Sequence, residues 1–220
     1  SYNPNLLVGR ERGRNYAMLV NDSLLPLFNR ALMAQYPPGS TIKMAQALIG
    51  LQEGVITPDT RFFCAGGYTS GNFRVGCHHN QAFDIEGSIS HSCNAYYVYV
   101  FRAILENPRY EGIKQAYEGW YRRMLDFGFG RTLGSDISGE LKGMVPTSEY
   151  YQRYVFKKSR WRALPVISLS IGQGELGITP FQLANYAAMV ANRGYYYIPH
   201  FVREIEGIPL PAKYNSPVES

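Results

Sequence analysis

The stretch YPPGSTIKMAQALIGLQEG, residues 36–54, decides how this chain folds. Two prolines and a glycine enforce a sharp turn, because proline fixes its own φ and glycine adopts backbone conformations that other residues resist. Ser40 follows the turn and opens a predicted helix, which Gly54 ends. Apolar residues lie on nearly every side of this helix, a pattern typical of a buried helix. We therefore expect the helix over residues 40–53 to be buried.

The composition is that of a folded globular protein. Of the 220 residues, 45% are apolar, 18% charged and 14% aromatic, which excludes disordered, collagen-like and coiled-coil chains. No apolar run approaches the roughly 18 residues that a transmembrane helix needs. The net charge is +5, but the basic residues are scattered, whereas nucleic-acid binding gathers them on one face. We expect no nucleic-acid partner.

Helical patterns dominate the rest of the chain, and strand is scarce. Helices are expected over residues 21–36, 84–92, 94–106, 110–128, 147–158 and 179–192. The last begins with Thr179, Pro180 and Gln182 in the order of a capping box. The remaining segments are predicted to be a polar arm or loop over 1–19, a glycine-rich irregular segment with short extended pieces over 57–83, a loop over 131–146 and a strand over 195–207.

Ser40 and Lys43 form the first candidate for chemistry. Their spacing places a hydroxyl and an amine on one helix face. A serine is a poor nucleophile until a base takes its proton, and a neutral lysine amine can do so. An S-x-x-K tetrapeptide alone is a weak signal, because it arises by chance. The tight turn, the helix start and the apolar surroundings strengthen it, since burial would desolvate Lys43.

Ser92-Cys93-Asn94 forms the second candidate, at the junction of two predicted helices. A hydroxyl there can relay a proton, and a side-chain amide can bind a peptide carbonyl or the lysine. The same residues are also common helix caps. Both interpretations stay open at this point.

The cysteines Cys64, Cys77 and Cys93 are too few for a disulfide scaffold, and their spacing is not that of a zinc motif. Cys64 and Cys77 could form a disulfide in an oxidising compartment. His78 and His79 follow directly, which gives a superficially metal-like group. Adjacent histidines rarely face one site, so we interpret the group as part of an exposed loop and expect no metal.

Together these motifs resemble the penicillin-binding transpeptidases, whose signature is S-x-x-K, then S-x-N, then K-[TS]-G. The resemblance covers nearly the whole chain: NPNLLVG, LVNDSLLPLFNRAL, YPPGSTIK and IGQGELGITPFQLANYAAMVANRG are all similar to class B, elongation-type enzymes. The IGQG run is itself highly specific.

The resemblance implies that Ser40 is the acylated nucleophile and Lys43 its general base. Ser92 would pass the proton to the leaving group, and Asn94 would hold the donor peptide. The family attacks the D-Ala-D-Ala stem peptide of peptidoglycan, expels the terminal D-Ala and transfers the acyl group to an amine of a second stem. β-Lactams mimic that dipeptide and would block Ser40. Gln173 is interpreted as structural, and no cofactor is implied.

The resemblance also implies where the protein works, because the substrate lies outside the cytoplasmic membrane. We expect the periplasm, at the extracytoplasmic face of the inner membrane, with the family's N-terminal membrane anchor absent from these residues. The implied partner is a membrane glycosyltransferase of the cell-wall elongation complex.

The chain departs from the family at the third motif. No K-T-G or K-S-G occurs, and the nearest string, residues 157–160, lacks the glycine and precedes the IGQG run. The family's first two strands also precede a segment like SYNPN. We therefore expect a mainly α fold: residues 1–220 as the helix-rich part of the α+β DD-peptidase or serine β-lactamase-like transpeptidase fold. The K-T-G strand, the N-terminal strands and most of the central antiparallel sheet would be absent.

Two consequences are expected from the missing strands. The pKa of Lys43 must fall from about 10.4 toward about 7, roughly 4–5 kcal/mol, and a half-open pocket would not supply that. Loss of one oxyanion-hole donor slows acylation by about 100- to 1,000-fold. We therefore expect this chain to be inactive or impaired. We also expect it either to self-associate through apolar surface on residues 40–53 or to be locally disordered around residues 57–83.

Two rival functions stay open. A serine β-lactamase or β-lactam sensor shares S-x-x-K, and fast turnover of penicillin would favour it over a transpeptidase. In a non-catalytic helical scaffold, Ser40 and Asn94 would serve only as helix caps, and Ser40→Ala would leave penicillin labelling intact.

Overall fold

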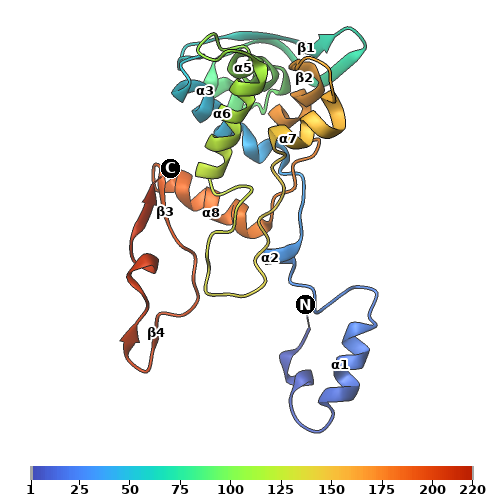
Figure 1. The fold of residues 1–220 in the computed structure, drawn as a ribbon, viewed down its shortest axis with the longest axis vertical. Coiled ribbons are helices and arrows are strands. Elements are labelled where there is room, and N and C mark those ends of the chain that lie inside the picture. The colour runs from blue at the N-terminus through green and yellow to red at the C-terminus, as the bar shows by residue number, and fades with distance from the viewer. Residues whose placement is uncertain (1, 220) are drawn as a thin grey trace.

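Helix α5 (Asn94–Leu105) is the centre of the fold in the computed structural model, which describes residues 2–219. Its sequence, NAYYVYVFRAIL, is apolar on nearly every side, and most of its side chains are fully buried. Helices α3 (Lys43–Gln52) and α6 (Ile113–Asp126) and the turn η4 (Leu164–Ile171) pack against it. In Figure 1 these elements form the upper body, from which the N-terminal and C-terminal segments extend downward.

The predicted helix over residues 40–53 is confirmed, with a 3-10 first turn. Ser40 lies in η2 (Gly39–Ile42), α3 follows directly, and Gly54 ends it at φ +69°. The helix is not buried all round: Met44 is 36% and Leu48 43% exposed. One apolar face of α3 therefore stays open.

The segment over residues 57–83 was expected to be irregular with short extended pieces, but it forms one long hairpin instead. Strands β1 (Phe62–Ser70) and β2 (Phe73–Phe83) pair antiparallel, with a register shift between Ala65 and Gly67. The hairpin packs against α5, beside which it runs in Figure 1. Its inward side chains, among them Cys64, Tyr68 and Val75, are buried. The many glycines hid the alternation of inward and outward side chains that defines these strands.

The other predicted helices of the body are confirmed. They are α4 (Ile85–Ser90), α5, α6, α7 (Ser148–Tyr151) continued by the π-helical turn η3 (Gln152–Phe156), and α8 (Pro180–Ala191). The predicted capping box at the start of α8 is present, between Thr179 and Gln182. Residues 131–146 form the predicted loop.

The two ends of the chain differ from prediction. The expected helix over residues 21–36 contains only α2 (Arg30–Met33), because Leu25 takes φ +50° and Pro26 follows it. The expected arm instead holds η1 (Pro4–Leu7) and α1 (Arg12–Val20).

At the C-terminal end, only β3 (Tyr195–Tyr197) and β4 (Glu204–Ile205) form within the predicted strand over residues 195–207. Beyond it lie β5 (Ile208–Pro209), η5 (Ala212–Tyr214) and β6 (Pro217–Glu219). Strand β3 pairs with β6, and β4 pairs with β5.

Helix exceeds strand, at 44% against 16% of the chain. Within residues 2–219 the strands form three sheets of two strands each. None of the helices in that range has both the length and the apolar character needed to cross a membrane.

Candidate active site

The fold brings the two polar motifs together at one end of α5. Ser40 lies in the turn before α3, and Lys43 is the first residue of that helix. Ser92 lies between α4 and α5, and Asn94 is the first residue of α5. Because α3 packs against both α4 and α5, all four sequence-predicted site residues converge.

Lys43 is hydrogen-bonded to Ser92 and Asn94 of the second motif. Its Nζ donates to the backbone carbonyl of Ser92 at 2.6 Å, to Ser92 Oγ at 2.9 Å and to Asn94 Oδ1 at 2.7 Å. An ammonium group has three N–H donors, so these acceptors satisfy all of them. The residue is only 3% exposed. Lys43 is therefore fixed in one orientation.

Ser92 lies between the lysine and the candidate nucleophile. Its Oγ is 3.0 Å from Ser40 Oγ and 2.9 Å from Lys43 Nζ. Ser92 also takes φ +50°, a conformation that is unfavourable for residues other than glycine by about 1–3 kcal/mol and that clusters at functional sites. The described contacts thus link Ser40 to Lys43 through the Ser92 hydroxyl.

Burial shifts the protonation of Lys43. Desolvation lowers the pKa of its amine, and the nearby thiols of Cys77 and Cys93 act in the opposite direction. The ring of Tyr97 lies 5.7 Å from Nζ. The net lowering of the pKa favours the neutral amine, which is the form that can accept a proton.

Asn94 joins the cluster to the hairpin. Its Nδ2 donates to the carbonyl of Gly76 at 2.9 Å, while its Oδ1 accepts from Lys43. The side chain makes no capping hydrogen bond for α5, whose N-cap is Cys93. The capping interpretation of Asn94 is therefore wrong: its amide connects β2 to Lys43.

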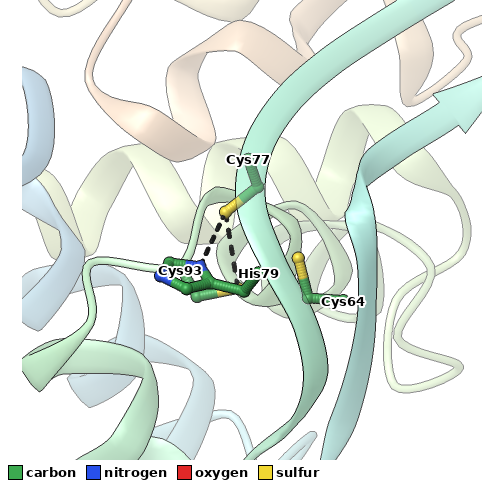
Figure 2. Close-up of side chains that lie close together, drawn as sticks. All are labelled: Cys64, Cys77, His79 and Cys93. Atoms are coloured by element: carbon green, nitrogen blue, oxygen red, sulfur yellow. Dashed lines mark hydrogen bonds between the residues drawn. The ribbon is translucent and has the colours of Figure 1, made fainter.

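A second cluster lies directly behind Ser92-Cys93-Asn94. Donor atoms of Cys64, Cys77, His79 and Cys93 all lie within 4.8 Å of one another. Cys77 Sγ lies 3.1 Å from His79 Nδ1 and 3.9 Å from Cys93 Sγ, and the dashed lines in Figure 2 mark these two contacts. All three cysteines are free thiols. Three thiolates and one imidazole are a donor set of structural zinc sites.

From the sequence, the group of Cys64, Cys77, His78 and His79 is expected to be part of an exposed loop and not a metal site. His78 indeed points away, because successive side chains alternate across β2 and His78 is exposed. His79 instead lies on the same side as Cys77. The missing member was Cys93, the middle residue of S-x-N. No local spacing connects it to the hairpin, so only the packing of α5 under β1 and β2 reveals the fourth donor.

Two thiols of the cluster, those of Cys77 and Cys93, have very different pKa values. Burial opposes ionisation of Cys77, but hydrogen bonds from the backbone of Asn94 and from His79 outweigh it and lower the pKa of that thiol to about 6. Burial raises the pKa of the Cys93 thiol to about 12. Cys77 therefore ionises at a lower pH than Cys93.

The whole chain, residues 1–220, matches the family model described as the penicillin binding protein transpeptidase domain. It is 35% identical to the peptidoglycan D,D-transpeptidase MrdA of Acinetobacter baumannii, over 99% of this chain. The chain spans 31% of that relative's length.

Solved structures show the same likeness. Pseudomonas aeruginosa PBP2, solved in complex with WCK 5153, is 32% identical with a TM-score of 0.81, over 99% of this chain and 47% of the other. A structure described as showing polymerization and crosslinking by a peptidoglycan synthase complex contains a chain that is 30% identical with a TM-score of 0.79. That match covers 96% of this chain and 34% of the other. Sequence and fold therefore match along nearly all of this chain.

Proposed function

The chain belongs to the penicillin-binding protein transpeptidase family. From this premise we propose that it carries the active site of a peptidoglycan D,D-transpeptidase, in which Ser40 is the residue that is acylated. The observation that carries the proposal is the continuous contact from Ser40 Oγ to Ser92 Oγ at 3.0 Å and on to Lys43 Nζ at 2.9 Å. A nucleophile, a relay and a base of lowered pKa are the parts that serine acyl transfer needs.

The first step is acylation of Ser40. Neutral Lys43 has two N–H groups, which can donate to the Ser92 carbonyl and Asn94 Oδ1, and a lone pair that can accept from Ser92 Oγ. Ser92 in turn can accept from Ser40, because hydroxyl hydrogens rotate. As Ser40 Oγ attacks the carbonyl of the penultimate D-Ala, its proton moves through Ser92 to Lys43. The ester bond to Ser40 forms, and the peptide bond to the terminal D-Ala breaks.

The second half completes the transfer. Ser92 returns the proton to the departing amine of D-Ala. An amine of a second stem peptide then attacks the ester, and the Ser40 oxygen takes back a proton as the cross-link forms. Asn94 faces this site from the end of α5 and is assigned to hold the donor peptide. β-Lactams would open on the same serine and leave it blocked.

The proposed substrate implies where the protein works, and one structural likeness supports a partner. Peptidoglycan lies outside the cytoplasmic membrane, so we assign the protein to the periplasm, at the extracytoplasmic face of the inner membrane. The likeness to a chain of a synthase complex that couples polymerization to crosslinking supports a membrane glycosyltransferase as partner.

Residues 1–220 are proposed to be the helical portion of the transpeptidase domain, and to be acylated more slowly than the complete gene product. Strands make up only 16% of the chain, and no K-T-G occurs in it. In this family that strand offers the second oxyanion-hole N–H, and loss of one such donor slows acylation by about 100- to 1,000-fold. Burial of Lys43 does not depend on the missing strands, because this residue is already only 3% exposed.

The cluster of Cys64, Cys77, His79 and Cys93 is proposed to hold a structural Zn²⁺. Four protein ligands would fill a tetrahedral site and leave no open position for catalysis. The ion would tie β1 and β2 to the S-x-N junction and so hold Ser92 and Asn94 in place.

Acyl transfer by the complete gene product tests the proposed function. The protein is incubated with a stem pentapeptide ending in D-Ala-D-Ala and an amine acceptor, and the released D-Ala and the new peptide bond are followed by mass spectrometry. We expect transfer by the unchanged protein and none by Ser40→Ala. Rapid hydrolysis of benzylpenicillin without transfer to the amine would instead identify a β-lactamase.

A further inference from the structure

The turn that carries Ser40 is held from behind by hydrogen bonds that the proposed reaction does not use. The Gly39 N–H, directly before Ser40, donates to the Gly172 carbonyl at 2.9 Å. The Gly172 N–H donates to the Leu169 carbonyl at 3.1 Å. Backbone of the IGQG segment is thus bonded directly to the nucleophile turn.

The same carbonyl binds the helix that carries Lys43. Gln46 Nε2 donates to the Leu169 carbonyl at 3.1 Å, and Gln46 Oε1 accepts from Trp120 Nε1 at 2.9 Å. Gln46 is fully buried and lies one turn after Lys43. An unbroken chain therefore runs from Trp120 on α6 through Gln46 and Gly172 to the Gly39 amide.

The contact between the two glycines leaves no space for a side chain. Gly172 takes φ +73°, and a Cβ there would lie 2.2 Å from the Gly39 carbonyl oxygen and 2.5 Å from its nitrogen. Real Cβ atoms do not approach other atoms below about 3.0 Å. Because both neighbours are backbone atoms, any side chain at position 172 must displace the turn itself.

A second backbone contact fixes the entry to the turn. Tyr36 N–H donates to the Ile178 carbonyl at 3.0 Å, and Ile178 N–H donates to the Tyr36 carbonyl at 2.8 Å. Residues 172–178 thus bind the nucleophile turn at both ends, and η4 also contacts η2.

We propose that Gly172 and Gln46 are positioning residues, which set the orientation of Ser40 by holding the Gly39 amide through this hydrogen-bond chain. The inference rests on the proposed function, because it gives Ser40 a reaction to be positioned for. Neither residue touches the reacting atoms. A misplacement of about 1 Å in a reacting group is enough to slow a reaction by about 100-fold.

Gly172→Ala in the complete gene product tests the inference, with Gly134→Ala as its matched control. Gly134 takes φ +81° but has nothing within 4 Å of its Cβ position, so it carries the same conformational strain without the clash. We expect Gly172→Ala to slow the acylation step with a fluorescent penicillin by about 10- to 100-fold. Noncovalent affinity should change by less than about twofold, and the control should change neither.

Hydrogen exchange of the peptide covering residues 36–43 gives a readout that needs no reaction. Gly172→Ala should speed its exchange, and Gly134→Ala should not. Unchanged exchange overturns the proposed chain, and faster exchange with unchanged acylation overturns its positioning role. If the unchanged protein is never acylated, the proposed function fails and exchange alone decides whether the turn is held.

Gln46→Met provides a second variant should Gly172→Ala not fold. It keeps the volume but removes the donor to Leu169, and the exposed Gln52→Met on the same helix is its control. We expect Gln46→Met to slow acylation without changing the noncovalent affinity for penicillin, and Gln52→Met to change neither. Equal effects of the two substitutions would contradict it.

Discussion

At the residue scale, the site depends on where one lysine finds its hydrogen-bond partners. Two acceptors of Lys43 come from Ser92 and one from Asn94, so S-x-N both orients the proposed base and lies between it and Ser40. The sequence predicted that Ser40, Lys43, Ser92 and Asn94 belong to one site, because S-x-x-K and S-x-N each have a recognisable local pattern. It did not predict that Ser92 stands between Ser40 and Lys43, since that order depends on packing between α3 and the junction of α4 with α5.

The relay predicts a large effect of Ser92→Ala. Removing the hydroxyl leaves no described link from Ser40 to Lys43, so acylation by penicillin should slow by about 100- to 10,000-fold. Ser90→Ala is the control, because Ser90 is exposed on α4 and bonds only within its own turn. Stopped-flow labelling with a fluorescent penicillin measures both rates. Equal rates for the two variants would rule out the relay.

The buried amine predicts how acylation depends on pH. Burial lowers the pKa of Lys43, and only the neutral amine accepts a proton, so the rate should rise with pH and level off below the ordinary lysine pKa of about 10.4. Between the lowered and the ordinary pKa, the folded state binds fewer protons than the unfolded state, so stability should also rise with pH in that window. Acylation rates between about pH 5 and pH 11 check this. A rate still climbing at pH 10.4 would contradict the lowered pKa.

At the scale of elements, the helices follow from local pattern and the hairpin does not. Helix α8 was predictable from its capping box, and α6 from its periodic apolar residues and the glycine after it. Strands β1 and β2 are rich in glycine and polar residues. Which of their side chains face inward is therefore visible only once the hairpin is packed on α5. The same packing joins Cys93 to the hairpin, which explains why the metal-like cluster could not be assembled from spacing.

The cluster predicts one zinc ion per chain. His79→Ala should abolish stoichiometric zinc, whereas the exposed neighbour His78→Ala should retain it. Loss of the ion should lower the melting temperature, because binding energy at a structural site adds to folding energy. Elemental analysis of the purified protein, with melting curves before and after chelation, tests this. Protein that contains no zinc and gains no stability on adding it would contradict the assignment.

At the scale of the whole molecule, one apolar face stays open. A cleft of about 550 Å³ is lined by residues of α3 and α8, among them Leu48, Leu51 and Met189, and by Phe127, the residue that follows α6. Met44 adds to the exposed apolar side of α3. Contiguous apolar surface of this kind marks an interaction site. The sequence indicated this face because helix 40–53 is too apolar to be solvated on any side.

The open face predicts that residues 1–220 self-associate. Leu48→Gln should shift the chain toward the monomer, because it places an amide in the cleft. Leu24→Gln should have no effect, because Leu24 lies in the N-terminal segment at 74% exposure. Light scattering across a concentration series measures both. A concentration-independent monomer for the unchanged chain would contradict the prediction.

Intact-mass spectrometry after incubation with excess benzylpenicillin tests whether Ser40 is the nucleophile. It compares the complete gene product, its Ser40→Ala variant and residues 1–220 alone. We expect one penicilloyl adduct on the complete product, mapped to Ser40, none on the variant, and slow or no modification of residues 1–220. An adduct that persists in Ser40→Ala, or none on the complete product, would contradict the assignment of Ser40 as the nucleophile. Equally fast acylation of residues 1–220 would contradict only their proposed impairment.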